Sequence, residues 1–303
     1  MKLNPNNVLG VMPPLITPFD AKEELDEEAL IREIRYHLVF GITGLILGGS
    51  TGEGATISPE ELQRICRIAV QEVNGKIPVI AGIIPDSTKE AVKKGKLAKD
   101  SGVDGLMVTP THYHIPTEDG IVEYYSTIGK DVGLPIIIYN VVPIVPLSAD
   151  LIARLADVNE VVGIKQSIGD GSASPGGQVE ILSEILERVG NKISVLASYD
   201  PLLFPGLALG AKGTIGAINT ILPELCVQLF DAVQDHEIEK ARELNKKIFP
   251  VSIQIKSSNW ASRVKTAINL QGRDVGLARS PMMPISDEEK EEMVSVLTAA
   301  GVL

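Results

Sequence analysis

The sequence offers little that suits a secreted, membrane-spanning or disulfide-linked protein. Its two cysteines, Cys66 and Cys226, both lie in apolar helical contexts, so we interpret them as small buried hydrophobic residues in a reducing compartment. No segment reaches the roughly 18 uninterrupted apolar residues of a membrane span, and the N-terminus shows no continuous apolar stretch like that of a signal peptide. We therefore expect a cytoplasmic protein that has no membrane partner.

Positive charge is also scarce. Lysine and arginine together number 28 against 39 aspartates and glutamates, which gives a formal net charge of -11 at pH 7. Nucleic acids and anionic membranes bind basic surfaces, and no basic run occurs in this chain. The composition argues against a nucleic-acid partner, while 303 residues with 44% hydrophobic side chains are ample for a large core.

Short apolar runs alternate with longer amphipathic segments over most of the chain. Eight such runs are each followed by a helix-like segment, and they cover residues 10–17, 44–48, 78–82, 105–109, 135–139, 161–165, 193–197 and 213–216. In the second of these helices Ser58 suits the N-cap, Pro59 the first helical position and Glu61 a capping box. Strands that are apolar throughout, each followed by a helix, predict an α/β fold in which eight parallel strands close a (β/α)8 TIM barrel.

The pattern changes after about Pro223. From there only helical periodicity remains, over 223–233, 237–249, 262–270 and 287–300. We predict a (β/α)8 catalytic barrel in residues 1–222. Residues 223–303 would supply the last barrel helix and a C-terminal helical extension, which is not an independent domain.

Lys165 ends the sixth apolar run, so its amine is expected at the carboxyl end of a buried strand. Catalytic groups of such barrels lie at this end of the strands. Poor hydration there disfavours the ammonium form, so that part of the population can be a free amine able to attack a carbonyl carbon and form a Schiff base. A lysine in this position can also extend to solvent or pair with a carboxylate, so the other strand ends must decide.

The second run leads into residues 48–54, Gly-Gly-Ser-Thr-Gly-Glu-Gly, which we call the glycine turn. Glycines allow backbone N–H groups to approach an anion closely, and the hydroxyls of Ser50 and Thr51 can add donors. The turn can therefore bind a small carboxylate, with Gly49 among its binding residues, although a purely structural use is the alternative. No lysine follows the last glycine, so it is not a phosphate-binding P-loop.

Phenol and imidazole groups follow two further strands. Tyr139, at the end of the fifth run, is either a core residue or a proton shuttle beside the amine. The fourth run leads into His112, Tyr113 and His114. Two histidines two residues apart suggest a metal, but no third ligand with suitable spacing accompanies them, so we predict no metal site.

The last two strand ends carry candidate substrate-binding residues. The polar groups of Ser198, Tyr199 and Asp200 can hold substrate hydroxyls, and Asp200 can equally cap the following helix. The eighth run leads into a segment that contains Ile215 and Asn219, where glycines keep the barrel mouth open. We include both residues among the substrate-binding candidates.

Five motifs together resemble the dihydrodipicolinate synthase/N-acetylneuraminate lyase family of class I pyruvate-dependent aldolases. They are Leu-Ile-Thr-Pro-Phe at 15–19, Gly-Ser-Thr-Gly-Glu at 49–53, Tyr-Asn-Val at 139–141, Gly-Ile-Lys at 163–165 and Arg-Ser-Pro-Met-Met-Pro-Ile-Ser at 279–286, in the family's order and spacing. The resemblance implies a metal-independent lyase, without a cofactor, in which Lys165 forms an imine with pyruvate or a related 2-oxo acid. It also implies that Tyr139 shuttles protons, that Ser50 relays them and grips the pyruvate carboxylate with Thr51, and that the subunits form a homotetramer, a dimer of dimers.

The residues expected to hold the second substrate depart from the family's synthase pattern. Synthases of the lysine pathway usually place an arginine shortly after the tyrosine-asparagine pair, whereas residues 141–147 here read Val-Val-Pro-Ile-Val-Pro-Leu. Valine or isoleucine cannot replace a bidentate carboxylate anchor. The wording of the glycine turn and the Tyr199-Asp200 pair look more like sialic-acid lyases and sugar-acid aldolases, although Pro201 stands where those lyases often have an acid.

The stretch 110–113 also differs from the paired tyrosines that are common in both sub-groups. If a neighbouring subunit's tyrosine completes the proton relay, Tyr113 is the candidate and His112 is its rival.

We therefore predict a Schiff-base-forming, pyruvate-dependent aldolase or lyase that acts on a 2-oxo-3-deoxy sugar acid or a related 2-oxo acid. Its small-molecule partners would be pyruvate and a small aldehyde or sugar acid. The first alternative is a 4-hydroxy-tetrahydrodipicolinate (dihydrodipicolinate) synthase with an unrecognised carboxylate anchor. The alternative from another class is a non-catalytic barrel that binds a sugar acid, and the combination of Lys165, Tyr139 and Ser50 argues against it.

Overall fold

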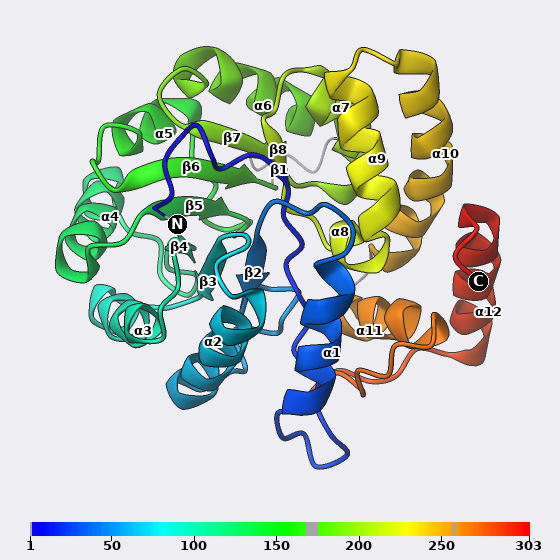
Figure 1. Cartoon of the computed structure of the whole chain (residues 1–303). Helices are drawn as coiled ribbons and strands as arrows, with labels where there is room; N and C mark the ends of the chain where they lie inside the picture. The colour runs from blue at the N-terminus through cyan, green and yellow to red at the C-terminus, as the bar shows by residue number, and fades with distance from the viewer. Residues whose placement is uncertain (1, 168–174, 257–258) are drawn as a thin grey trace.

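A ring of parallel strands forms the centre of the computed structural model, which describes residues 2–167, 175–256 and 259–303 (Figure 1). The eight strands of this described part are β1 (Gly10–Val11), β2 (Leu45–Leu47), β3 (Val79–Ile83), β4 (Gly105–Val108), β5 (Ile136–Asn140), β6 (Val161–Gln166), β7 (Ser194–Ala197) and β8 (Gly213–Thr214). They pair in the order β1-β8-β7-β6-β5-β4-β3-β2. The segment just after β1 closes the ring, because Pro14 bridges to Ile46 and the Leu15 N–H donates to the Ile46 carbonyl at 2.9 Å. The predicted (β/α)8 barrel is confirmed.

Helices follow the strands and surround the ring. They are α1 (Glu27–His37), α2 (Pro59–Val73), α3 (Thr88–Asp100), α4 (Glu118–Val132), α5 (Ala149–Leu155), α6 (Pro175–Val189), α7 (Leu203–Ala208), α8 (Ile218–Ile221) and α9 (Pro223–Gln234), with a short 3-10 helix η1 (Asp200–Leu202) before α7. The capping box predicted for α2 is present, since Ser58 accepts from the Glu61 N–H and Glu61 accepts from the Ser58 N–H. No helix of the described part is long and apolar enough to cross a membrane.

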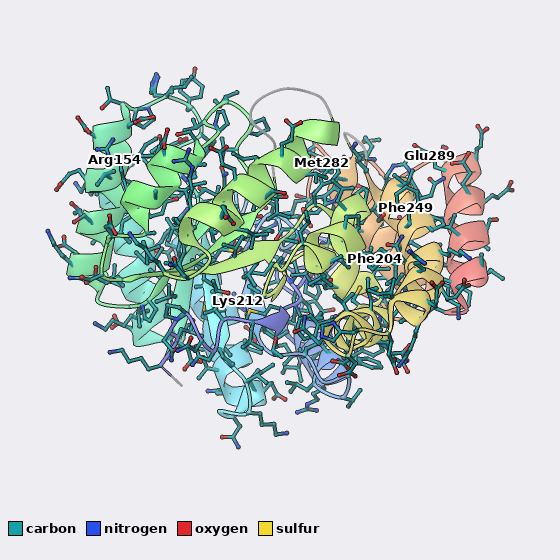
Figure 2. The ribbon with its side chains drawn as sticks, turned by 90° about the horizontal axis from the view of Figure 1, so that it is seen from above. Arg154, Phe204, Lys212, Phe249, Met282 and Glu289 are labelled. Atoms are coloured by element: carbon teal, nitrogen blue, oxygen red, sulfur yellow. The ribbon has the colours of Figure 1, made fainter. Side chains whose placement is uncertain are left out.

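The C-terminal extension consists of α10 (Ile238–Ile255), α11 (Trp260–Leu270) and α12 (Asp287–Ala300). Figure 1 shows α9, α10 and α12 side by side on one flank of the barrel. Seen from above, this flank carries Phe249 on α10 and Glu289 on α12, at the opposite side from Arg154 on α5 (Figure 2). The extension thus covers one side of the barrel only.

Helix α10 is longer than the sequence pattern predicted. We expected it to end at residue 249, because proline lacks the N–H that continues a helix, but the helix runs through Pro250 to Ile255. The residues beyond the proline are anchored by packing, since Val251, Ser252 and Ile255 are all buried. Tertiary packing therefore overrides the local stop signal and carries the chain to Lys256.

Alternation along the strands decides which side chains point into the barrel. On β5, Ile137 and Tyr139 belong to the cluster inside the ring, whereas Ile136 and Ile138 pack beneath the helices. On β6 an extra residue interrupts this alternation, because Ile136 pairs with Val161 while Ile137 pairs with Gly163. A bulge of this kind re-aims the side chains that follow it. Beyond it Lys165 pairs with Tyr139.

Candidate active site

A cavity of about 560 Å³ opens at the carboxyl ends of the strands. Its walls come from the ends of β2, β5, β6, β7 and β8 and from helices α10 and α11 of the extension. Seven of the predicted site residues line it: Ser50, Thr51, Tyr139, Lys165, Ser198, Tyr199 and Asp200. Segments far apart in the sequence therefore meet at this mouth of the barrel.

Lys165 lies on the floor of this cavity, with 5% of its surface exposed. Its Nζ lies 4.3 Å from the centroid of the Tyr139 ring. It has no ion-pair partner among the residues that the structure describes. A lysine that neither reaches solvent nor pairs with a described carboxylate fits neither structural explanation of its place, whereas its amine faces a space where a carbonyl compound can bind.

A pair of hydroxyls connects the amine to the glycine turn. The Tyr139 hydroxyl donates to Ser50 Oγ at 2.9 Å, and the Ser50 N–H points back to the Tyr139 oxygen at 3.3 Å. Since each hydroxyl can both donate and accept, this pair can move a proton toward or away from a group bound at Lys165.

The glycine turn is tightly packed, and the backbone around Gly54 leaves no room for a side chain there. A Cβ on Gly54 would lie 1.8 Å from the Gly48 carbonyl oxygen, and one on Gly82 in the neighbouring strand would lie 2.6 Å from the Gly49 nitrogen. Thr17 donates to the Gly52 carbonyl at 2.7 Å from the other side. The turn is therefore a fixed frame that holds Ser50 and Thr51 at the cavity.

The carboxylate of Glu53 connects this turn to the C-terminal extension. Glu53, which adopts a positive φ of 56°, pairs with Lys265 of α11 at 2.8 Å and accepts from the Arg279 N–H at 2.9 Å. Burial lowers the pKa of Lys265, while Glu53 opposes that shift. The Arg279 guanidinium also donates to the Thr56 carbonyl at 2.9 Å, so the motif at 279–286 anchors the segment after the turn.

Asp200 is partly buried at the β7 side of the cavity. It accepts at 3.3 Å from the N–H of Ile218, the first residue of α8, whereas η1, the helix that begins at Asp200, has no side-chain cap hydrogen bond. Burial raises the pKa of its carboxyl to about 6, against the opposing effects of the Ile218 N–H and of Lys165. Next to it, Ser198 is buried and its hydroxyl faces the Leu196 carbonyl at 3.4 Å.

Four predicted site residues do not line this cavity. Gly49 lies beneath it, where a Cβ would approach the Tyr139 hydroxyl to 3.9 Å. Ile215 is fully buried inside the barrel, and Asn219 is fully buried with its amide directed at the Thr214 carbonyl at 3.2 Å. A part in substrate binding for Ile215 and Asn219 stays a prediction.

Tyr113 lies outside the cavity of its own chain, on the loop after β4, with 76% of its surface exposed. The N–H groups of His112 and Tyr113 both donate to Asp86 at 3.0 Å, and the His112 ring lies 3.1 Å from the same carboxylate. The part of Tyr113 in a neighbouring subunit's proton relay stays a prediction.

Sequence reasoning pointed to the loop after β5 as part of the second-substrate site but missed the wall that the extension supplies. The additional lining residues are Val141, Pro143, Ser167, Pro201, Gly216, Ala217, Ser252, Ile255, Lys256 and Trp260. Of these, Lys256 carries charge and follows the end of α10. Lys256 does not stand at a strand end, and Pro250 led us to predict that the helix before it ends too early.

Comparisons with known proteins match nearly the whole chain to one protein family. The model of the dihydrodipicolinate synthetase family matches residues 7–300. The 4-hydroxy-tetrahydrodipicolinate synthase of Geotalea daltonii is 34% identical over 290 residues, which are 95% of this chain and 97% of that protein. The enzyme of the same description from Thermodesulfovibrio yellowstonii is 35% identical over 299 residues, covering 97% and 99% of the two chains.

Solved structures show the same similarity. Dihydrodipicolinate synthase from Aquifex aeolicus superposes with a TM-score of 0.88 at 33% identity, over 97% of this chain and 98% of that one. The prophage protein YagE of E. coli K12, which belongs to the dihydrodipicolinic acid synthase family and was solved in complex with pyruvate, superposes with a TM-score of 0.91 at 27% identity, over 98% and 99% of the two chains.

Proposed function

Because the chain belongs to the dihydrodipicolinate synthetase family and is a pyruvate-dependent aldolase of the lyase class, we propose that Lys165 forms the imine with pyruvate. The observation that carries this proposal is the buried amine of Lys165, 4.3 Å from the Tyr139 ring in the cavity that also holds Ser50 and Thr51. The hydroxyls and N–H groups of the glycine turn would bind the carboxylate of the 2-oxo acid.

The imine supplies the reactivity. Lys165 Nζ attacks the carbonyl carbon at position 2 of the 2-oxo acid, and loss of water leaves a protonated imine. In the cleavage direction the bond between carbons 3 and 4 breaks, its electron pair moves into the imine to form an enamine, and the hydroxyl on carbon 4 loses its proton as the aldehyde departs. Protonation at carbon 3 and hydrolysis then release pyruvate and restore the amine, and condensation is the reverse sequence.

The hydroxyl pair supplies the proton movement. Tyr139 would take the proton from the departing hydroxyl and Ser50 would relay it, consistent with their 2.9 Å hydrogen bond. We extend this relay to Tyr113 of the partner subunit within a homotetramer, because Tyr113 is exposed in its own chain. The cytoplasm remains the compartment that we propose.

Two candidate functions differ in the second substrate. A 2-oxo-3-deoxy sugar acid is supported by the apolar loop 141–147, which has no guanidinium, and by the polar groups of Ser198, Tyr199 and Asp200 along the wall. A 4-hydroxy-tetrahydrodipicolinate synthase is supported by the descriptions of the curated relatives, which agree on that activity. Comparison favours the second candidate, and the loop after β5 favours the first.

Trapping with borohydride tests the imine, because reduction fixes a lysine imine as a stable secondary amine. Incubation with pyruvate and borohydride should add one reduced pyruvate adduct to the peptide that carries Lys165, and Lys165→Ala should abolish it. Labelling of another lysine, or of none, would refute the proposed mechanism.

A substrate panel separates the two candidates. Aspartate semialdehyde and a set of 2-oxo-3-deoxy sugar acids are offered in turn, with consumption or release of pyruvate as the readout. A specificity constant above about 10⁴ M⁻¹s⁻¹ with aspartate semialdehyde would identify a synthase, and the same value with a sugar acid would identify the cleaving enzyme.

A further inference from the structure

The cavity extends well beyond the space that pyruvate needs. Pyruvate has six heavy atoms and would fill at most about 180 Å³, because even a whole water molecule takes up only about 30 Å³ in the liquid, whereas the cavity measures about 560 Å³. If the glycine turn after β2 holds the carboxylate and Lys165 on β6 holds the carbonyl carbon, the remaining space is bounded by the apolar loop after β5, the ends of β7 and β8, and the extension. The rest of the substrate must meet the side chains found there.

Lys256 brings a positive charge to that part of the cavity. It follows the last residue of α10 and lines the mouth, with its Nζ 5.1 Å from the centroid of the Tyr199 ring just after β7. The ring faces the ammonium group, and such contacts favour a cation at that place. The side chain is exposed and has no ion-pair partner within the described ranges.

The charges around Lys256 make this ammonium unusual. The protein carries a net charge of -11, which repels anions from its surface. The other described charges lining the cavity are Lys165, which reacts, and Asp200, which accepts from a backbone N–H. The loop 141–147 contributes no cation. Lys256 is therefore the described group that can hold a second anionic end of a substrate.

We propose that Lys256 and the Tyr199 ring form a distal anion subsite, so that the aldehyde partner carries a carboxylate or a phosphate at the end remote from its carbonyl. This inference rests on the proposed function for the position of the pyruvate part. It supplies the anchor that the loop after β5 lacks, and it places that anchor on the C-terminal extension instead of the barrel. A neutral aldehyde would gain nothing from Lys256.

Binding to the pyruvate-blocked enzyme tests the subsite directly. The enzyme is first reduced with pyruvate and borohydride, which occupies Lys165, and is then titrated with glycerate, glycerol 3-phosphate and glycerol. Trp260 reports occupancy, because it is the single tryptophan of the chain and it lines the same cavity. Glycerate and glycerol 3-phosphate distinguish a carboxylate from a phosphate, and glycerol is the uncharged control.

Lys256→Met should weaken binding of the preferred anion by about 10-fold or more, the range of one charged hydrogen bond, and leave glycerol unchanged. Lys256→Arg should retain most of the affinity. Lys247→Met is the matched control, because Lys247 is an exposed lysine of α10, the helix that Lys256 follows, and does not line the cavity; it should change nothing.

The inference is overturned if neither anion binds the wild-type protein better than glycerol, or if Lys256→Met and Lys247→Met behave alike. Failure of the proposed function looks different: no adduct forms at Lys165. The titrations can then be run on the untreated protein, where loss of anion affinity in Lys256→Met alone would still support the subsite.

Discussion

At the scale of single residues, the hydroxyl of Tyr139 is the group whose role can be isolated most cleanly. Tyr139→Phe should lower turnover by roughly two to three orders of magnitude, because a positioned proton carrier is removed, while the borohydride adduct at Lys165 still forms. Ser50→Ala should act in the same direction with a smaller effect. Steady-state turnover and adduct yield measure the two properties separately.

Tyr125→Phe provides the control for that experiment. The Tyr125 hydroxyl is buried and donates to the Val108 carbonyl at 2.8 Å, on the helix side of the sheet and away from the cavity. Its loss should reduce stability slightly and leave turnover intact. Near-normal turnover in Tyr139→Phe would instead make Tyr139 an ordinary core residue.

Asp200 gives a prediction about pH. Burial raises the pKa of its carboxyl in the folded protein to about 6, from an ordinary value of 3.8. Between these values the folded protein keeps a proton that the unfolded chain has released, so the free energy of unfolding should fall as pH rises through this window. Across this window the free energy of unfolding should fall by at most about 3 kcal/mol in total, because a tenfold change in proton affinity corresponds to about 1.4 kcal/mol.

Urea unfolding at pH 4 and pH 7 measures this effect against Asp200→Asn, whose amide oxygen can still accept from the Ile218 N–H. The free energy of unfolding of the wild type, relative to that of the variant, should fall as pH rises. Parallel pH dependences of the two proteins would show that Asp200 does not titrate in this range.

The sequence was sufficient to indicate the residues that we propose to react, because each of them stands at a strand end. Lys165, Tyr139 and Ser50 were all found in this way, and the structure brings them to one cavity. The extra residue on β6, which pairs Lys165 with Tyr139, could not be foreseen, because a bulge depends on how two strands align rather than on local composition.

At the scale of elements, the glycine turn depends on a buried ion pair with the extension. Lys265→Met should destabilise the protein by about 3–5 kcal/mol, because it leaves the Glu53 carboxylate buried beside an apolar side chain. Part of the loss should return in the double variant Lys265→Met/Glu53→Gln, in which no uncompensated charge remains. Chemical unfolding of the three proteins gives these differences.

The same variants should also disturb pyruvate binding, because Glu53 belongs to the turn that frames Ser50 and Thr51. The KM for pyruvate should rise in Lys265→Met and partly recover in the double variant. An equal stability of Lys265→Met and wild type would contradict this account of the pair.

Helix α10 shows why part of the site stayed out of reach of sequence analysis. A Phe-Pro pair at 249–250 normally ends a helix, and this local rule is sound. Burial of Val251, Ser252 and Ile255 outweighs it, and such packing becomes known only when α10 is placed beside α9 and α12. Sequence analysis therefore could not identify Lys256 and Trp260 as site residues.

At the scale of the whole molecule, the barrel could be predicted because its unit recurs. Eight apolar runs, each with its own helix, leave few other ways to bury the strands on both faces. The sequence of one chain does not show what its exposed side chains contact in a neighbouring subunit. Tyr113 has 76% of its surface exposed, and its chain's own cavity does not include it.

Mixing two inactive variants tests whether Tyr113 serves a neighbouring subunit. Lys165→Ala lacks the amine, and Tyr113→Phe should lose at least about 100-fold in turnover if its phenol carries a proton. In a hybrid pair, the subunit with Tyr113→Phe still has Lys165 and would receive Tyr113 from its Lys165→Ala partner. One site in each hybrid pair is then complete, so random equal mixing should restore about a quarter of wild-type activity.

Lys165→Ala mixed with Tyr139→Phe is the control for that experiment, because Tyr139 and Lys165 line the same cavity of one chain. Exchange of subunits cannot bring these two groups together, so that mixture should stay inactive. If Tyr113→Phe alone keeps its turnover and an alanine at His112 loses it, the relay runs through the imidazole instead. If the first mixture gains no activity although subunits exchange, Tyr113 acts within its own chain and its loop must move to reach the cavity.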